Sequence, residues 1–404
     1  MKRYSMRWIN LNNVDEAKRA LFQIGSDSSG IEIMAGKAVG RAIKLEKIPL
    51  PVAHILKQEM LSLGGDVAVH RNVITGKIES TDALVLGTVR QLKKLAKKLY
   101  AQPFGLKTFG QALSQLLENI EVTSERILDC RGKSLTFGQR TLVMGILNLT
   151  PDSFSDGGKF FNAEDAIAQA DRLVADGADI LDIGAESTRP SYNEISAEEE
   201  WARLEPVIRL LVPRVKVPIS IDTYKAVVAE KALQAGANII NDIWGLQRDP
   251  DIAKVAGEYQ APVVVMHNQT GTNYQCLMGD IIDFLRKSIE IAEEHGLSGD
   301  QIIVDPGIGF GKTTEQNLEV MCRLSEFKTL GQPILLGASR KSMIGNTLNL
   351  PVNERLEGTI ATSVIAAQAG VDIVRVHDVK ENKRAVSMAD AILRNKRGTA
   401  YEGA

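Results

Sequence analysis

The segment GADILDIGAESTRP, residues 177–190, contains the pattern from which we infer the fold. It begins with Gly177, at a position where a helix would end in a left-handed cap. A β-rich run, ADILDIGA from Ala178, follows and is largely apolar, which is typical of a parallel strand covered on both faces. Further polar residues follow where the run ends, at Glu186, Thr188 and Arg189.

Seven further segments repeat this pattern, and a stretch of helical period follows each. They are LVMGILNL from Leu142, VPISID from Val217, NIINDI from Asn238, APVVVMH from Ala261, QIIVDPG from Gln301, PILLGAS from Pro333 and DIVRVHD from Asp372. Strands that alternate with helices indicate parallel βαβ units. Eight units in about 260 residues match a TIM (β/α)8 barrel, whereas an open doubly wound sheet more often stops at five or six strands.

The first 122 residues differ in texture and predict a small α/β domain ahead of the barrel domain, residues 123–404. Strand-like pieces lie near Met6–Leu11, Arg41–Leu45 and Leu84–Gly87, and helical patterns near Val14–Ile24, Val52–Leu63, Val89–Tyr100 and Thr108–Leu117. The segment RILDCRGKSLTFGQ from Arg126 predicts a hairpin that turns at Gly132. We expect this hairpin to plug the bottom of the barrel.

The composition argues against several classes of function. The 404 residues are 44% apolar and 24% charged, and a formal net charge of -2 leaves no basic field that would attract nucleic acid. Three scattered cysteines are too few for a disulfide framework and indicate a reducing compartment. No apolar stretch has the length of a signal peptide or a membrane span. We therefore expect a cytoplasmic protein with no nucleic-acid or membrane partner.

Polar side chains end each of the eight runs, where the mouth of a barrel would collect them. A structural ion pair explains any one of them as well as a ligand contact does, because a buried carboxylate needs a partner. Their coincidence on eight strands favours a polar ligand. The residues are Asn148; Glu186, Thr188 and Arg189; Asp222; Asn241 and Asp242; His267 and Asn268; Asp305; Ser339, Arg340 and Lys341; and Arg375, His377 and Asp378.

Two loops add candidates to this set. In NLTPDSFSDGGKF from Asn148, an apolar Phe154 on a polar loop indicates either a lid that excludes water or packing on the adjacent loop. In ESTRPSYNE, Pro190 holds Arg189 in an extended conformation that suits an anion. Arg189, Lys341, Arg375 and His377 together would match a phosphate, a diphosphate or a carboxylate.

Known nucleotide and metal motifs do not account for the chain. VDPGIGFGKT from Val304 lacks the spacing of a phosphate-binding loop or a dinucleotide fingerprint. No HExxH, paired CxxC or cluster of three histidines indicates zinc or iron. A magnesium ion that a diphosphate brings with it stays possible.

Taken together, the segments resemble the dihydropteroate synthase family from about Arg126 to the C-terminus. The resemblance rests on MGILNLTPDSFSDGG, GADILDIGAESTRP, ISIDT, GANIINDI, VVVMH, IIVDPGIGFGK, LLGASRKS and IVRVHDV, in the order the family uses. It implies a transferase that condenses 6-hydroxymethyl-7,8-dihydropterin diphosphate with p-aminobenzoate, giving 7,8-dihydropteroate and diphosphate in folate biosynthesis. It also implies Mg²⁺ and a homodimer.

The resemblance implies a role for each matching residue. The pterin-binding positions are Asp222, Asn241, Asp305 and Lys341, with Met266 against the ring face; the diphosphate positions are Asn148, Arg375 and His377, of which Asn148 is also the magnesium ligand; and the positions near p-aminobenzoate are Phe154, Asp156, Thr188, Arg189, Phe310 and Ser342. In the implied mechanism diphosphate leaves first and the aniline nitrogen attacks a cationic methylene carbon. Lys341, Arg375, His377 and Mg²⁺ would stabilise the leaving charge, and Asp156 and Asp222 the cation.

Two alternatives from other classes stay open at this point. A methyltransferase that passes a methyl group from methyltetrahydrofolate to a corrinoid protein uses a related barrel with Asp and Asn contacts to the pterin. It has no diphosphate to hold, so SRKS from Ser339 and RVHD from Arg375 argue against it. A non-catalytic pterin-binding module would have lost some of Asn148, Arg189, Lys341, Arg375 and His377, and all five are present.

Overall fold

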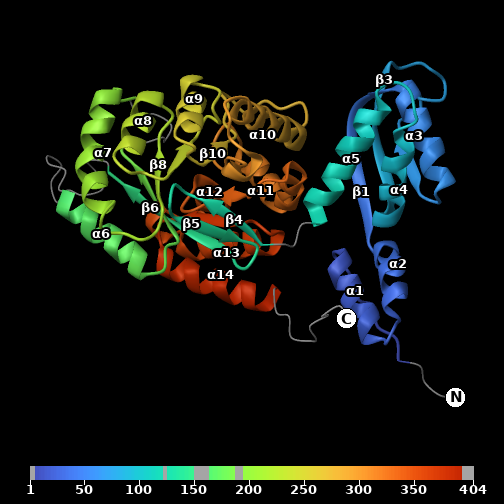
Figure 1. Cartoon of the computed structure of the whole chain (residues 1–404), viewed down its shortest axis with the longest axis horizontal. Helices are drawn as coiled ribbons and strands as arrows, with labels where there is room; N and C mark the ends of the chain where they lie inside the picture. Colours follow the sequence, from blue (N-terminus) through green and yellow to red (C-terminus); the bar gives the residue numbers. More distant parts are fainter. Residues whose placement is uncertain (1–4, 122–124, 150–162, 187–193, 394–404) are drawn as a thin grey trace. The chain divides into compact units, whose positions relative to one another are not determined.

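The computed structural model of the chain describes residues 5–121, 125–149, 163–186 and 194–393 (Figure 1). These residues fall into two compact units, the first containing residues 5–121 and the second residues 125–393. The two units are described separately below.

The first unit contains a three-stranded antiparallel sheet in the order β1-β3-β2. Its elements are α1 (Val14–Gln23), α2 (Ser28–Ala38), β1 (Gly40–Pro49), α3 (Leu50–Ser62), β2 (Asp66–Val69), β3 (Ser80–Thr88), α4 (Val89–Leu99) and α5 (Leu106–Glu121). Alternate residues of the strands, among them Ile43, Val67 and Val85, form a core with buried residues of α3, α4 and α5.

The strand expected near Met6–Leu11 is absent: residues 5–12 form neither a strand nor a helix. Met6 and Trp8 are exposed there, so the pattern has no sheet to join. Helix α2 and strand β2 were not expected. The other strands and helices expected in this region are confirmed within a few residues at their ends.

The second unit contains eight parallel strands in the order β11-β10-β9-β8-β7-β6-β13-β12. Their bounds are β6 (Leu142–Asn148), β7 (Ile180–Gly184), β8 (Ile219–Asp222), β9 (Ile239–Asp242), β10 (Val263–Met266), β11 (Ile302–Asp305), β12 (Leu335–Leu336) and β13 (Ile373–Val376). The two outer strands also meet, because Val304 forms a parallel bridge with Ile334 and its N–H donates to the Pro333 carbonyl at 2.9 Å. The eight strands therefore close, which confirms the expected TIM barrel.

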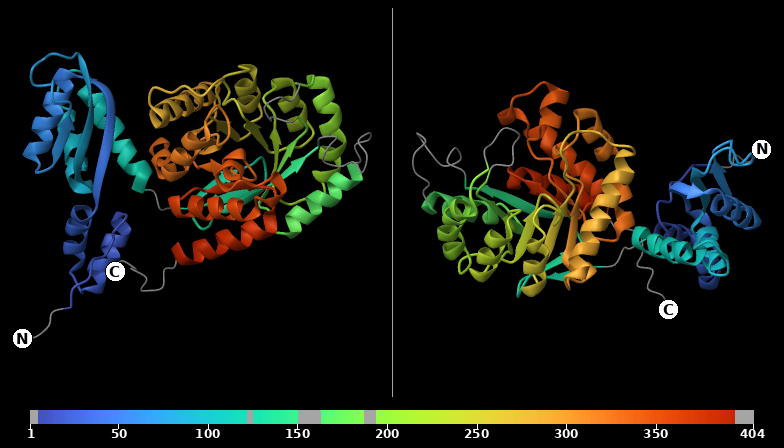
Figure 2. Two further views of the ribbon diagram at one scale, coloured as in Figure 1. Left: turned by 180° about the vertical axis from the view of Figure 1, so that it is seen from behind. Right: turned by 90° about the horizontal axis from the view of Figure 1, so that it is seen from above.

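Helices cover the outside of these strands in all three views (Figures 1 and 2). They are α6 (Ala163–Ala175), α7 (Ala197–Leu211), α8 (Ala226–Gln234), α9 (Asp251–Glu258), α10 (Leu277–Glu294), α11 (Thr314–Cys322), α12 (Ser342–Leu348), α13 (Leu356–Ala369) and α14 (Val379–Leu393), with short 3-10 turns at Gly299–Gln301, Leu324–Leu330 and Val352–Glu354. Gly177, Gly236 and Gly296 have positive φ angles as expected. Within the described ranges, no helix has both the length and the apolarity needed to cross a membrane.

The interior of the barrel has an apolar floor. The inward residues nearest the amino ends of the strands form one buried cluster with the hairpin of β4 (Arg126–Asp129) and β5 (Ser134–Phe137). The hairpin contributes Leu128, Cys130, Leu135 and Phe137. The hairpin turns at Gly132, whose φ of 88° is in the left-handed region, so its predicted position at the barrel bottom is confirmed.

Candidate functional site

A polar layer lies directly above this apolar floor. Side chains on a strand alternate between its two faces, so the residue two positions beyond an inward floor residue also faces inward. Asp182 follows Ile180 in this way, Asn241 follows Ile239, Asp305 follows Ile303 and Arg375 follows Ile373. Four strands thus bring charged or amide groups to one level, at the end of the barrel where substrates bind in this fold.

Arg375 holds this layer together through two carboxylates. Its Nε lies 2.6 Å from Asp182 Oδ2, and its Nη2 lies 2.7 Å from Asp222 Oδ2. Asn241 Nδ2 donates to the same Asp182 carboxylate at 3.2 Å. Asp182 is fully buried, and the side chains of Arg375 and Asp222 are 17% and 13% exposed. The site therefore contains a desolvated ion-pair network that spans strands β7, β8, β9 and β13.

Two carboxyl groups of the site are hard to ionise. Burial raises the pKa of Asp222 to about 7, with Arg375 opposing the shift and Asp182 adding to it. Burial also raises the pKa of Asp305 to about 6, although the Gly307 N–H donates to its Oδ1 at 2.7 Å. The charge of Lys341 lowers both pKa values, which places this ammonium group near both carboxyl groups.

An apolar wall adjoins the polar layer. Met266, at the end of β10, is buried with Tyr224 and Ile243, and the half-buried Trp244 and Phe310 pack against them. Because a flat aromatic ligand needs both an apolar face and hydrogen-bonding partners at its edge, this wall and the polar layer complement each other.

Phe310 also meets Lys341. The Nζ of Lys341 lies 4.0 Å from the centre of the Phe310 ring, a cation–π contact. Lys341 is the N-cap residue of α12, and Ser342 is the exposed first residue of that helix. Asn148 ends β6 on the inward side and is half-buried.

His377 is a neutral hydrogen-bonding group in this structure. Burial lowers its pKa to about 3, and the nearby charges of Arg375 and Arg340 add to this shift. Ser339 Oγ accepts from the His377 N–H at 3.2 Å and lies 3.0 Å from its Nδ1. The hydroxyl hydrogen can therefore point at Nδ1, which leaves the ring proton on Nε2. His377 can donate one hydrogen bond but adds no positive charge.

Some polar strand ends have structural roles. Asp242 accepts from the N–H groups of Trp244 and Leu246 at 2.8 and 2.6 Å, so it shapes its own turn. Asp378 forms a two-bond ion pair with Arg340, which has a φ of 56°. For these residues the structural explanation holds.

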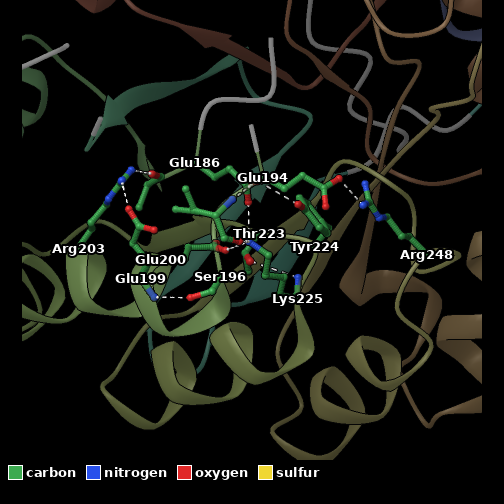
Figure 3. Close-up of polar contacts among 12 residues, drawn as sticks. Glu186, Glu194, Ser196, Glu199, Glu200, Arg203, Thr223, Tyr224, Lys225 and Arg248 are labelled. Atoms are coloured by element: carbon green, nitrogen blue, oxygen red, sulfur yellow. Dashed lines mark hydrogen bonds and ion pairs between the residues drawn. The ribbon is translucent and has the colours of Figure 1, made fainter. Parts of the chain in front are cut away.

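Glu186, at the end of β7, belongs to a separate buried cluster shown in Figure 3. Lys225 Nζ lies 2.6 Å from Glu186 Oε2 and 2.7 Å from Glu200 Oε2, and it donates to the Ile195 carbonyl at 2.8 Å. The Tyr224 hydroxyl donates to Glu186 Oε1 at 3.0 Å. This cluster holds residues on both sides of positions 187–193.

Four of the candidate residues, Phe154, Asp156, Thr188 and Arg189, lie outside the residues that the structure describes. The structure brings Asp222, Asn241, Asp305, Lys341, Met266, Phe310 and Arg375 together at the barrel mouth. Asn148, His377 and Ser342 lie at strand or helix ends on the same side.

Sequence reasoning missed two residues of this region. Asp182 lies inside an apolar strand. Only its position two residues after the inward-facing Ile180 distinguishes it from a residue that faces the helices. Lys312, which follows the turn after β11, is only 9% exposed. A lysine after three glycines carries no local sign of burial. Within the described ranges, no three His, Cys, Asp or Glu side chains are grouped so that they could hold a metal ion.

Comparisons with known proteins agree with this geometry. Residues 144–377 match a family described as pterin binding enzyme. The chain is 56% identical over 263 residues to a dihydropteroate synthase of Clostridium beijerinckii, covering 65% of this chain and 98% of that protein. A crystal structure of a Clostridium difficile dihydropteroate synthase, obtained in the presence of pteroic acid, has 55% identity and a TM-score of 0.63, and the match covers 64% of this chain and 98% of that one.

A further relative extends beyond the barrel. The chain is 41% identical over 390 residues to a probable bifunctional folylpolyglutamate synthase/dihydropteroate synthase of Halobacterium salinarum, covering 95% of this chain and 46% of that protein. A match of that extent includes most of the first unit, so this relative contains a counterpart of it.

Proposed function

The chain belongs to the dihydropteroate synthase family of pterin-binding enzymes, and we propose that the polar layer of its barrel carries the family's reaction. In this reaction 6-hydroxymethyl-7,8-dihydropterin diphosphate and p-aminobenzoate give 7,8-dihydropteroate and diphosphate in folate biosynthesis. The observation that carries the assignment of roles is the ion-pair network of Arg375 with Asp182 and Asp222 beside Asn241 and Asp305.

We propose that the polar groups of this layer bind the polar edges of a pterin. We assign Asp305 to the ring's amino and N–H edge and Lys341 to its carbonyl oxygen, with Asp222 and Asn241 at the remaining polar edge. Met266 would lie against the ring face. A buried aspartate beside an ammonium group binds an amidine-like N–H edge well, because the ligand supplies the donors that burial withholds.

The chemical step exchanges one bond at the methylene carbon. The C–O bond to diphosphate breaks first and its electron pair leaves with the oxygen, which leaves a cationic methylene carbon. The aniline nitrogen then donates its lone pair to this carbon and loses a proton to water. We assign Lys341 and Arg375 to the leaving negative charge and the Nε2–H of His377 to one of its oxygens. Asp222 would stabilise positive charge on the pterin and methylene carbon, a role we also propose for Asp156.

For p-aminobenzoate we propose contacts with Phe310 and Ser342, next to Lys341. Phe154, Thr188 and Arg189 complete this proposed set on the strength of the family resemblance. The Clostridium difficile relative supports a two-part site, since its structure was obtained in the presence of pteroic acid.

Magnesium fits one residue of this site. Mg²⁺ prefers oxygen ligands and often keeps one or two protein ligands beside phosphate oxygens. The side-chain oxygen of Asn148, at the inward end of β6, would be one such ligand. When bound with the diphosphate, the ion would neutralise part of its negative charge.

We also propose a cytoplasmic homodimer. All three cysteines are free thiols, which suits a reducing compartment. Ile365 on α13 and Met388 and Ile392 on α14 are 46%, 62% and 64% exposed, and such apolar side chains on packed helices favour a partner surface. Sedimentation should show a dimer that Met388→Glu weakens; a monomer at micromolar concentration would exclude it.

The decisive assay is the reaction itself. Purified protein with Mg²⁺, dihydropterin diphosphate and labelled p-aminobenzoate should form dihydropteroate. Lys341→Ala and Arg375→Ala should each lower kcat by about 100-fold, the usual cost of losing a group that stabilises developing charge. Lys380→Ala, an exposed lysine on α14, is the matched control and should not change kcat. Full turnover in both site variants would exclude the assigned roles, and no turnover in the unmodified protein would favour a binding protein.

A further inference from the structure

A buried lysine, Lys312, lies behind the proposed pterin site and has none of the substrate contacts assigned above. Its Nζ donates to the carbonyl oxygens of Gly307 and Phe310 at 3.0 and 3.1 Å and lies 2.9 Å from His267 Nδ1. An ammonium group has three N–H donors, and these three acceptors match them. Burial lowers the pKa of His267 to about 3, so this ring is neutral and its Nδ1 can accept.

Burying the charged group of Lys312 costs free energy, which its hydrogen bonds to the chain must offset. Burial lowers the pKa of Lys312 to about 7, because the protein interior disfavours the charged form. An apolar side chain of similar length would fill the same space without that cost. We therefore infer that the lysine is present for its hydrogen bonds, two of which hold the turn of residues 306–311.

That turn needs an external anchor. Gly307, Gly309 and Gly311 have φ angles of 70°, 83° and 57°, and glycine loses more conformational freedom on folding than any other residue. A Cβ at Gly307 would lie 1.9 Å from the His267 carbonyl oxygen, so the turn packs tightly on the end of β10. Lys312 satisfies two inward carbonyls of the turn and connects it to the same residue, His267.

This turn also contacts two residues assigned to the pterin, Asp305 and Lys341. The Gly307 N–H donates to Asp305 Oδ1 at 2.7 Å, which orients the carboxylate. The Phe310 ring lies 4.0 Å from Lys341 Nζ, and a Cβ at Gly309 would lie 3.1 Å from the Lys341 side chain. A shift of the turn would therefore move both Asp305 and Lys341.

We propose that Lys312 is a positioning residue for the pterin substrate, which fixes Asp305 and Lys341 by holding the 306–311 turn against His267. The proposal rests on the function given above and concerns a residue that makes none of the assigned substrate contacts. The turn contacts both pterin-binding residues, Asp305 and Lys341, but contains only one residue assigned to p-aminobenzoate, Phe310, so the loss should fall mainly on the pterin.

The test compares Lys312→Met, Lys312→Gln and, as matched control, Lys254→Met, which changes an exposed lysine on α9. Calorimetry measures binding of 6-hydroxymethylpterin to the full-length protein, and kinetics give KM for each substrate. Lys312→Met should weaken pterin binding between about 10-fold and about 100-fold, the range that displaced binding groups show. Lys312→Gln keeps two N–H donors and should lose less. The KM for p-aminobenzoate at saturating pterin diphosphate should rise by a clearly smaller factor than the loss of pterin binding, because only Phe310 of the turn belongs to the site proposed for p-aminobenzoate.

Pterin binding within twofold of the unmodified protein in the glutamine and methionine variants would overturn the proposal, as would equal losses for both substrates. If the methionine variant does not fold, the glutamine variant decides alone by the same criterion. The Lys254→Met variant and the unmodified protein report separately on the function. Absence of turnover in both would refute the assigned reaction, while calorimetry would still decide the role of Lys312.

Discussion

Replacing Asp182 by asparagine removes one charge from the buried network at almost constant shape. Asp182 accepts from Arg375 Nε at 2.6 Å and from Asn241 Nδ2 at 3.2 Å, and it is fully buried. In the variant, Arg375 keeps the carboxylate of Asp222 at 2.7 Å but loses the second charge. The asparagine oxygen can accept only part of what the carboxylate accepted.

The expected cost follows from this geometry. Removing one partner of a buried ion pair costs about 3–5 kcal/mol. The lower end of this range applies, because Arg375 keeps its ion pair with Asp222 and because the repulsion between the Asp182 and Asp222 carboxylates is relieved. We expect the free energy of unfolding of the barrel to fall by about 3 kcal/mol. Turnover should fall as well, since Arg375 and Asn241 no longer share a charged acceptor.

Urea titration followed by tryptophan fluorescence measures this loss. A Trp8→Phe background leaves Trp201 and Trp244, both in the barrel unit, as reporters. Glu205→Gln, which removes a partly exposed ion pair on α7, is the control and should cost less than about 0.5 kcal/mol. If Asp182→Asn cost no more than this control and left turnover unchanged, the ion-pair network would neither stabilise the barrel nor support the reaction, and the reasoning would be refuted.

Two further predictions concern the histidines and a glycine. Since His267 and His377 have a pKa of about 3 in the folded chain, the unfolded chain binds more protons between about pH 3 and 6.5; their contribution to stability rises with pH across this window and is lost as the pH falls. NMR titration of the five histidines should find these two neutral at pH 5, and a protonated ring at either position would contradict the burial argument. Gly307→Ala should destabilise the barrel by clearly more than Gly271→Ala in thermal unfolding, because a Cβ meets the His267 carbonyl at 1.9 Å in the first case and open space in the second, while both φ angles are positive. Equal losses would show that backbone strain, of about 1–2 kcal/mol, is the whole effect.

The eight barrel strands were predictable because each is a local pattern, an apolar run between helical stretches that ends in polar residues. The same reasoning failed where the local pattern was weak or isolated. Strand β2 has only four residues, Asp66–Val69, and the run near Met6–Leu11 has no strand partner. Most candidate residues at the barrel mouth followed from strand ends, whereas Asp182 and Lys312 required the interior to be seen.

The amino-acid sequence by itself determined which residues lie on the eight barrel strands and which of them share a face, since alternation along a strand is a property of the backbone. Only the tertiary structure decided which side chains meet. Arg375 is 193 residues from Asp182 and 153 from Asp222, and their strands come together because β6 pairs with β13 on one side and with β7 on the other. Burial then sets the chemistry, because a carboxylate, a guanidinium or an imidazole removed from water takes its charge and its pKa from neighbours that the order of residues does not name.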